Sequence, residues 1–266
     1  MQHKYASPIV AKYGGAALPA AGQTDPTLAE IAALRERGDA VILIHGGGPE
    51  IDEALRVRGI DSERIDGHRV TDEQALAVVE ATLCGTINKR LVRLALVLGL
   101  RAVGISGEDG GLLRARRAWG AGGEDLGFVG EIEACDPAIL HALLEHAILP
   151  VVAPLAISQD GAHAYNVNAD LAAAAIAAAL RARAFVVLTN VPRVLADPDD
   201  ERSGIERMTP DEARAFATNA ACRSSMKPKV LAAAIAVEDG AEASYICGAG
   251  TGAISRALAG DATIVA

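Results

Sequence analysis

The sequence predicts an α/β protein in which a mainly parallel, open sheet carries helices on both faces. Its 266 residues suffice for one large α/β domain or for two lobes that share one core. Strand-like runs alternate with helical patterns nearly from end to end, as in repeated β–α–β units. Hydrophobic residues make up 51% of the chain but aromatic residues only 3%, which favours close packing of helices on a sheet.

The expected elements of the first part of the chain follow from apolar runs and from the capping residues between them. Asp25 can cap a helix that Gly38 ends, and Thr71 with Gln74 has capping-box spacing at the start of a long helical pattern. The expected strands are 7–13, 40–44, 101–106 and 149–156, and the expected helices are 24–38, 49–59, 71–99 and 136–146.

The alternation continues to the end of the chain after one interruption. Residues 107–133 are glycine-rich with short apolar pieces, which is typical of a hairpin that leaves the sheet. The glycine-rich stretch 248–253 is expected to be a turn, because too few residues follow it for a dinucleotide-binding unit. The remaining expected strands are 184–191 and 243–248, and the remaining expected helices are 168–182, 209–217 and 225–240.

Composition excludes several classes of partner. The formal net charge of −9 and the scarcity of aromatic residues argue against a surface that binds nucleic acid. The four cysteines lack metal-ligand spacing, so we expect reduced core residues and no metal site of protein ligands. The first residues lack the apolar region of a signal peptide, and the most apolar helical stretch is far shorter than the roughly 20 residues that span a bilayer. We therefore expect a cytoplasmic protein without a membrane partner.

One stretch, VILIHGGGPEID at 41–52, raises the question of an anion site. A strand, three glycines and a helix start follow one another, so backbone N–H groups can approach a phosphate, although a purely steric turn explains the glycines equally well. Lys12 also ends a strand, just before Gly14 and Gly15. Because ligands collect at the carboxyl ends of parallel strands, the two glycine-rich strand ends together favour a phosphate site.

Further polar residues lie at helix starts. Asn168 can cap the helix that begins near Asp170, but a cap needs neither Asn166 nor Asp170, so a polar ligand site is plausible. Lys229 lies in the first turn of another helix, where a cation opposes the dipole, and this hints at a compensating anion. Arg69 precedes a helix start in a loop suited to a carboxylate.

Common catalytic motifs are missing from the sequence. It contains no Walker-type G-x-x-x-x-G-K-[ST], no zinc-binding spacing among its six histidines, and no G-x-S-x-G around Ser106. His45 is expected to orient or pack rather than to act as a base.

The motifs VAKYGG, HGGGP, GHRVT, LCGTINKRLV, NVNAD, VVLTNVP and MKPKV occur in an order and spacing that resemble the amino-acid kinase family. The resemblance covers nearly the whole chain. It implies a three-layer αβα sandwich around a mainly parallel open sheet. Residues 1–180 would form an N-terminal lobe for acetylglutamate binding and dimerisation, and residues 181–266 a C-terminal lobe for ATP.

The same resemblance implies transfer of the γ-phosphoryl group of ATP to the side-chain carboxylate of N-acetyl-L-glutamate, a step of arginine biosynthesis. Lys12 and Lys229 would flank the phosphoryl group, and Asp170 would hold both lysines. Mg²⁺ would be held mainly by the nucleotide phosphates. Gly47, Gly48, Arg69, Asn166 and Asn168 would bind the acceptor, while Gly14, Gly15, Asn190, Val191 and Met226 would contact the nucleotide.

The chain departs from the family pattern at several positions. Asn190 replaces a common Asp, and Arg193 and Ser225 replace usual glycines, which affects nucleotide binding more than the phosphoryl site. The chain begins almost directly at its first strand, without the N-terminal helix of arginine-controlled members, so we expect a homodimer without arginine feedback. Two alternatives stay open: a kinase for aminoadipate or glutamate on an acidic carrier protein, and a non-catalytic metabolite sensor.

Overall fold

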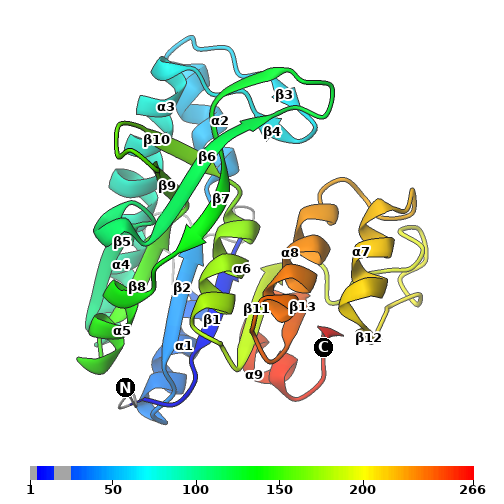
Figure 1. Ribbon diagram of the computed structural model, residues 1–266. Coiled ribbons are helices and arrows are strands. Elements are labelled where there is room, and N and C mark those ends of the chain that lie inside the picture. Colours follow the sequence, from blue (N-terminus) through cyan, green and yellow to red (C-terminus); the bar gives the residue numbers. More distant parts are fainter. Residues whose placement is uncertain (1–4, 15–24) are drawn as a thin grey trace.

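An eight-stranded sheet forms the centre of the computed structural model, which describes residues 5–14 and 25–266 (Figure 1). The strand order is β12-β14-β13-β11-β1-β2-β8-β5, and every neighbouring pair is parallel except β13 with β14. The mainly parallel open sheet is thereby confirmed. The strands are β1 Ile9–Tyr13, β2 Val41–His45, β5 Ala102–Ser106, β8 Leu149–Ala153, β11 Ala184–Thr189, β12 Arg207–Met208, β13 Ser244–Gly248 and β14 Thr263–Val265.

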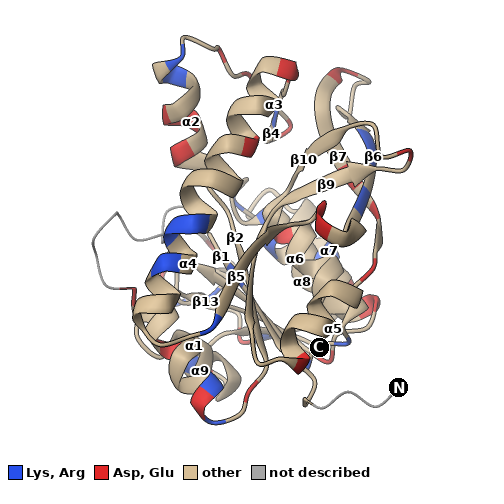
Figure 2. Ribbon diagram, turned by 90° about the vertical axis from the view of Figure 1, so that its left-hand side faces the viewer, with Lys and Arg blue, Asp and Glu red and all other residues tan. Residues whose placement is uncertain are grey.

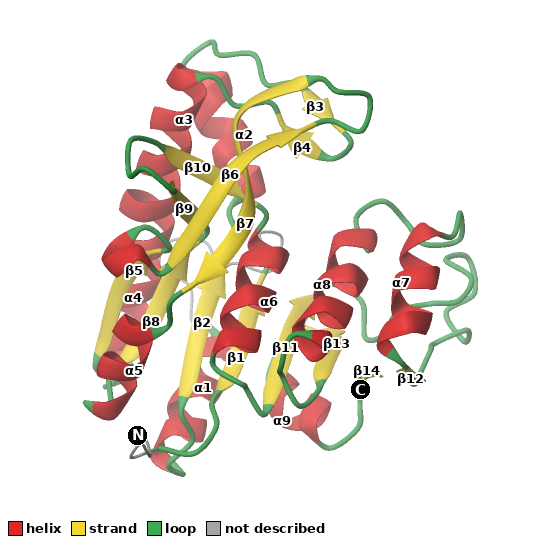
Figure 3. Ribbon diagram, viewed as in Figure 1, coloured by secondary structure: helices red, strands yellow, loops and turns green. Residues whose placement is uncertain are grey.

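Helices cover both faces of this sheet (Figure 3). One face carries α1 Pro26–Glu36, α4 Asn88–Val97 and α9 Ala253–Leu258, and the other carries α5 Ala138–Glu145, α6 Ala169–Ala179 and α8 Lys227–Glu238, with α7 Pro210–Thr218 packed on α8. Side chains alternate along β1, so Ile9, Ala11 and Tyr13 enter the first core layer and Val10 enters the second. Lys12 therefore points to the side of α6 and α8.

A smaller β-structure lies above the carboxyl ends of the N-terminal strands (Figure 1). It is a closed barrel of β6 Leu113–Trp119, β7 Asp125–Cys135, β9 Leu155–Ser158 and β10 Ala164–Val167, accompanied by the hairpin of β3 Arg64–Ile65 and β4 His68–Arg69. The expected hairpin at 107–133 is confirmed as β6 and β7. The single strand expected at 149–156 is wrong, because the chain leaves the sheet at Pro154, which lacks the N–H that a ladder needs.

The long helix expected at 71–99 is divided into three segments in the structure. These are α3 Glu73–Glu80, a π-helix Ala81–Ile87 and α4. The predicted capping box is also wrong, because the backbone of Thr71 bonds to β7 through Leu126 O and the helix starts one residue later. The carboxylate of Asp72 accepts the capping hydrogen bond from Ala75 N at 2.7 Å. The helix α2, Gly48–Val57, packs beside this region.

Other local predictions are confirmed in detail. Asp25 caps α1 by accepting from Thr27 N and Leu28 N, and Gly38 takes a φ of +90° after that helix. All four cysteines are free, but only Cys222 and Cys247 are fully buried, so the expectation of core cysteines holds for half of them. Among the residues that the structure describes, no helix is both long and apolar enough to cross a bilayer. Along α2 the acidic residues precede Arg56, which lies in the last turn (Figure 2).

Candidate active site

A cavity of about 340 Å³ opens at the carboxyl edge of the sheet, between the glycine loop after β2, the β3–β4 hairpin and the starts of α6 and α8. The eight residues that the sequence predicted to be catalytic or acceptor-binding all line it. They are Lys12, Gly47, Gly48, Arg69, Asn166, Asn168, Asp170 and Lys229. Segments more than 200 residues apart in the sequence thus supply one site, because the carboxyl ends of parallel strands meet at one edge.

Two lysines share one buried carboxylate at the centre of this cavity. Lys12 Nζ lies 2.8 Å from Asp170 Oδ1, and Lys229 Nζ lies 3.3 Å from Asp170 Oδ2 and 3.2 Å from the carbonyl oxygen of Ser225. Lys12 and Asp170 are about 5% exposed. The triad therefore carries a net charge of +1 in a nearly dry setting, where it attracts an anion strongly.

The pKa directions agree with this arrangement. Burial favours the neutral acid, but the charges of Lys12 and Lys229 outweigh it and hold the pKa of Asp170 below its usual value. Burial, with the charge of Lys229, lowers the pKa of Lys12, and Asp170 opposes that shift. Asp170 is accordingly an ionised anchor for two cations rather than a proton acceptor.

The three glycines play unequal parts in the loop that follows β2. A Cβ on Gly47 would lie 2.4 Å from Ile87 Cδ1 and 2.9 Å from Leu83 Cδ2, so a side chain there would force these buried side chains of the π-helix to shift. A Cβ on Gly48 would meet nothing within 4 Å. The steric reading of the glycines therefore holds at Gly47, while Gly48 leaves open space inside the cavity.

Arg69 is held in the cavity wall by a network that the sequence did not reveal. Its guanidinium donates to Ser62 Oγ at 2.8 Å and forms an ion pair with Asp52 Oδ1 at 2.6 Å. Burial lowers the pKa of Arg69, and the Asp52 carboxylate opposes this. Asp52 lies on α2, which begins in the glycine loop, so one carboxylate ties the arginine to that loop. In the sequence, only the position of Asp52 a few residues after the glycines, on the same expected helix, could have indicated the contact with Arg69.

The two asparagines line the cavity from β10 and from the start of α6. Asn168 Oδ1 caps α6 by accepting from Asp170 N at 2.8 Å and Leu171 N at 3.2 Å, which confirms the capping interpretation and leaves its amide nitrogen for a ligand. Asn166 donates from Nδ2 to Thr71 Oγ1 at 3.4 Å. Both side chains present amide groups to the cavity that also holds Arg69.

The residues predicted to contact a nucleotide do not all lie in one pocket. Val191 and Met226 line a small apolar pocket with Phe216 and Cys222. Asn190 is exposed at the end of β11 and accepts from Thr189 Oγ1. A Cβ on Gly14 would lie 3.3 Å from Lys12 Nζ, and Gly15 lies outside the described residues. The departure at Arg193 puts its guanidinium beside Glu206 and Asp261 at the surface.

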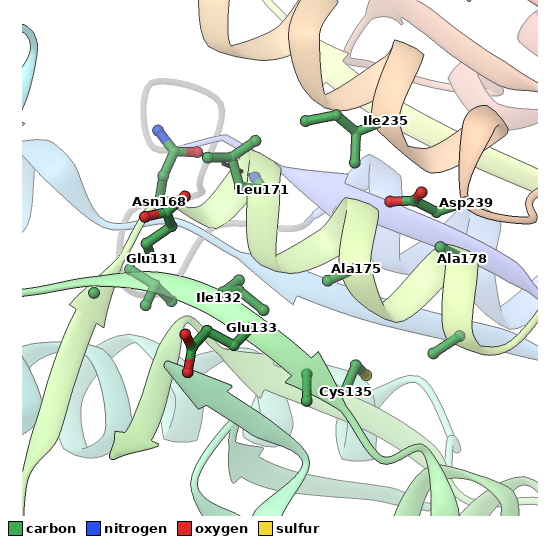
Figure 4. A pocket seen from close by; sticks show the side chains of 14 residues that line it. Glu131, Ile132, Glu133, Cys135, Asn168, Leu171, Ala175, Ala178, Ile235 and Asp239 are labelled. Carbon is green, nitrogen blue, oxygen red and sulfur yellow. Dashed lines mark hydrogen bonds between the residues drawn. The ribbon is translucent and has the colours of Figure 1, made fainter. Parts of the chain in front are cut away.

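A larger cavity of about 420 Å³ lies between β7, α6 and α8 (Figure 4). Its wall along α6 consists of small and apolar side chains such as Ala175 and Leu171, and its acidic groups are Glu131, Glu133 and Asp239. Carboxylates repel an anionic substrate, and neither Lys12 nor Lys229 lines this space. The smaller cavity with the two lysines is therefore the candidate active site.

A cationic triad, a glycine loop at a helix start and an adjoining apolar pocket, all at the carboxyl edge of an αβα sandwich, define a phosphotransferase that acts on anionic substrates. Among known protein families, the amino acid kinase family matches residues 7–248. The chain therefore belongs to that family.

Relatives and solved structures agree with this membership. An acetylglutamate kinase of Symbiobacterium thermophilum is 38% identical over 243 residues, which cover 90% of this chain and 83% of the relative. An acetylglutamate kinase of Methanopyrus kandleri is 44% identical over 211 residues, or 78% of this chain and 85% of the relative. The structure of N-acetylglutamate synthase from Neisseria gonorrhoeae, complexed with coenzyme A and N-acetyl-glutamate, is similar with a TM-score of 0.82 and 27% identity. The match covers 98% of this chain and 59% of the synthase.

Proposed function

We propose that the chain is an ATP-dependent kinase that phosphorylates the side-chain carboxylate of N-acetyl-L-glutamate, a step of arginine biosynthesis. The observation that carries this proposal is the Lys12–Asp170–Lys229 triad in one cavity with Arg69 and two asparagines. The relatives named acetylglutamate kinase match most of this chain and most of their own length, which supports the choice of acceptor.

The residues offer the acceptor three kinds of contact. Arg69 offers a guanidinium for the carboxylate that does not react, and planar donors suit a carboxylate well. Asn166 and Asn168 offer amide groups for the polar acetamido group. Gly47 and Gly48 bring backbone N–H groups to the reacting end. A diacid with an amide is the acceptor that uses all of these groups.

The phosphoryl step needs charge stabilisation and alignment rather than a base. A side-chain carboxylate with a reference pKa of about 4.3 is already ionised at neutral pH and attacks as it stands. Its oxygen forms a bond to the γ-phosphorus while the bond to the bridging oxygen of ADP breaks, so an acyl phosphate and ADP result. Lys12 and Lys229 flank the equatorial oxygens and offset the repulsion between the two anions.

ATP and Mg²⁺ fit the groups that surround the triad. We place the adenine near Val191 and Met226 and the phosphates toward Gly14, Gly15 and Lys229. Among the described residues that line the active-site cavity, Asp170 is the only carboxylate, and both of its oxygens face lysines. We propose that Mg²⁺ would be held mainly by the nucleotide phosphates, where it would neutralise charge.

The proposed division into lobes follows from the position of the triad. Residues 1–180 supply the acceptor side and residues 181–266 supply the nucleotide side with Lys229. Both lobes share one sheet and both core layers, so Asp170 links them across the middle of the molecule.

We also propose a cytoplasmic homodimer. Its four free cysteines suit a reducing compartment. The edge strand β5 exposes Val103 and the end of α4 exposes Leu96, Val97 and Leu98, which are apolar side chains of the kind that oligomers cover. Light scattering on the intact chain tests this, and a monomeric mass would contradict it.

A hydroxylamine trap tests the activity itself. The protein is incubated with ATP, Mg²⁺ and a panel of free and N-acetylated acidic amino acids, and hydroxamate formation reports an acyl phosphate. We expect hydroxamate with N-acetylglutamate and far less with free glutamate or aminoadipate. Turnover only with a carrier-bound acceptor would favour the carrier-protein alternative, and binding of both substrates without ADP release would favour a sensor.

A further inference from the structure

The imidazole of His45 lies beneath the glycine loop and outside the active-site cavity. His45 ends β2, is completely buried, and its Nδ1 lies 2.9 Å from the carbonyl oxygen of Gly46. Its other nitrogen, Nε2, lies 3.2 Å from Asn88 Nδ2. The ring thus connects the glycine loop with the first residue of α4.

Asn88 determines which ring nitrogen carries the proton. One hydrogen of its Nδ2 is donated to Val151 O at 2.9 Å, the other is shared between Ile105 O at 3.3 Å and His45 Nε2 at 3.2 Å, and its Oδ1 accepts from Lys89 Nζ at 3.1 Å. These partners fix the orientation of the amide, so an N–H and not an oxygen faces His45. Nε2 is consequently an acceptor, and Nδ1 carries the hydrogen that is donated to Gly46 O. Burial, and the nearby charges of Arg90 and Lys89, keep the ring neutral by lowering its pKa to about 4 despite the opposing bond to Gly46.

The neighbouring strands are built to admit Asn88. A Cβ on Gly104 of β5 would lie 1.8 Å from Asn88 Oδ1, so only a glycine there lets the amide reach between β2, β8 and β5. Asn88 is 1% exposed. The amide therefore has one position available, and His45 is held from behind.

The hydrogen bond to Gly46 O sets the direction of the next N–H. No described peptide bond is cis, and in a trans peptide the C=O and the N–H point in opposite directions. Since Gly46 O points to the imidazole, Gly47 N–H points away from it. Gly46 to Gly48 line the cavity, and within the described residues no acceptor for Gly47 N–H is found.

We infer that His45 and Asn88 are positioning residues of the phosphoryl transfer, which hold the Gly46–Gly47 peptide so that Gly47 N–H faces the transferring group. This inference rests on the proposed function. His45 acts through the loop and does not touch the substrates. The π-helix fixes the same loop from the side through Leu83 and Ile87.

Two amide variants of His45 separate this role from packing. In His45→Asn the amide nitrogen takes about the place of Nδ1 and still donates to Gly46 O, whereas in His45→Gln the amide oxygen takes about the place of Nε2 and accepts only from Asn88. We expect His45→Asn to keep kcat close to wild type and His45→Gln to lose roughly 10² in kcat, the scale for one lost transition-state donor. The KM values for ATP and acetylglutamate should change less than kcat, and both variants should lose similar thermal stability.

Equal losses of kcat in the two variants, or no loss in either, would overturn the inference while leaving the proposed function intact. A wild-type protein that forms no acyl phosphate with any acceptor would overturn the proposed function and, with it, the inference. Nitrogen-15 NMR of the wild-type imidazoles gives a readout that needs no variant. The Nδ1–H tautomer is expected for His45 at neutral pH, and the Nε2–H tautomer would overturn the inference.

Discussion

Asp170→Asn removes the charge between the two lysines while keeping the shape of the side chain. At an effective dielectric constant of 20, unit charges 2.8 and 3.3 Å apart attract each other by about 6 and about 5 kcal/mol. Desolvation cancels much of this, and loss of one partner from a buried ion pair costs roughly 3–5 kcal/mol. The variant should fold with reduced stability and leave the buried ammonium group of Lys12 and the partly buried one of Lys229 without a counter-charge.

The catalytic consequence follows from the pKa of Lys12. Burial and Lys229 already lower that pKa, and Asp170 is the group that opposes them, so its removal lowers the pKa further. A neutral Lys12 cannot stabilise the phosphoryl oxygens. We expect kcat to fall by roughly 10²–10³ and the alkaline limb of the kcat profile to move to lower pH.

The assay is ADP release against pH under saturating substrates. Asp25→Asn is the matched control, because Asp25 is equally buried, at 4% exposed, and also lies at a helix start. The Asp25→Asn variant should lose only stability, and the alkaline limb of its kcat profile should stay where it is in the wild type. Near-normal turnover of Asp170→Asn with an unmoved alkaline limb would refute the reasoning.

Four further expectations follow from the same geometry. Lys229→Ala should lower kcat by roughly 10² with smaller changes in substrate binding, and normal turnover would remove this lysine from the mechanism. Arg69→Lys should mainly raise the KM for acetylglutamate, because a single ammonium cannot replace the guanidinium fork; unchanged acceptor kinetics would count against that contact. Gly47→Ala should destabilise the protein through its clash with the π-helix, whereas Gly48→Ala should keep the thermal midpoint and weaken acceptor use; the reverse order would contradict the model of the loop. Burial lowers the pKa of His45 from 6.5 in the unfolded chain to about 4 in the folded protein, so the folded state should lose about 3 kcal/mol of stability as the pH falls from 6.5 through 4. Denaturant titrations of the wild type and of His45→Asn measure this loss as the difference between the two proteins. An equal pH dependence of stability in both would contradict a buried neutral ring.

Local patterns in the sequence indicated the frame of the fold and pointed to several of the residues that line the candidate active site. Apolar runs indicated the central strands, and the capping role of Asn168 followed from its place before a helix. Lys12 could be placed at the sheet edge because it ends a strand. The grouping of Lys12, Asp170 and Lys229 required the additional rule that carboxyl ends of parallel strands meet.

The sequence did not predict features that depend on contacts between distant segments. The helix after Thr71 starts late because β7 pairs with that residue, and no local pattern shows this. Asp52 binds Arg69 only because α2 and the β3–β4 hairpin are folded together. The need for glycine at Gly47 comes from the π-helix, which lies more than 30 residues away in the chain. Tertiary contacts thus decide the supporting groups of the site.

The most direct test of the central claim is a crystal structure with ADP, Mg²⁺, tetrafluoroaluminate and N-acetylglutamate, in which the planar fluoride imitates the phosphoryl group in flight. The account predicts that Nζ of Lys12 and Nζ of Lys229 both lie within about 3.2 Å of the fluoride ligands, with Asp170 still between the lysines. Either lysine directed away from the fluoride, or Asp170 bound to the metal or to the acceptor, would contradict it.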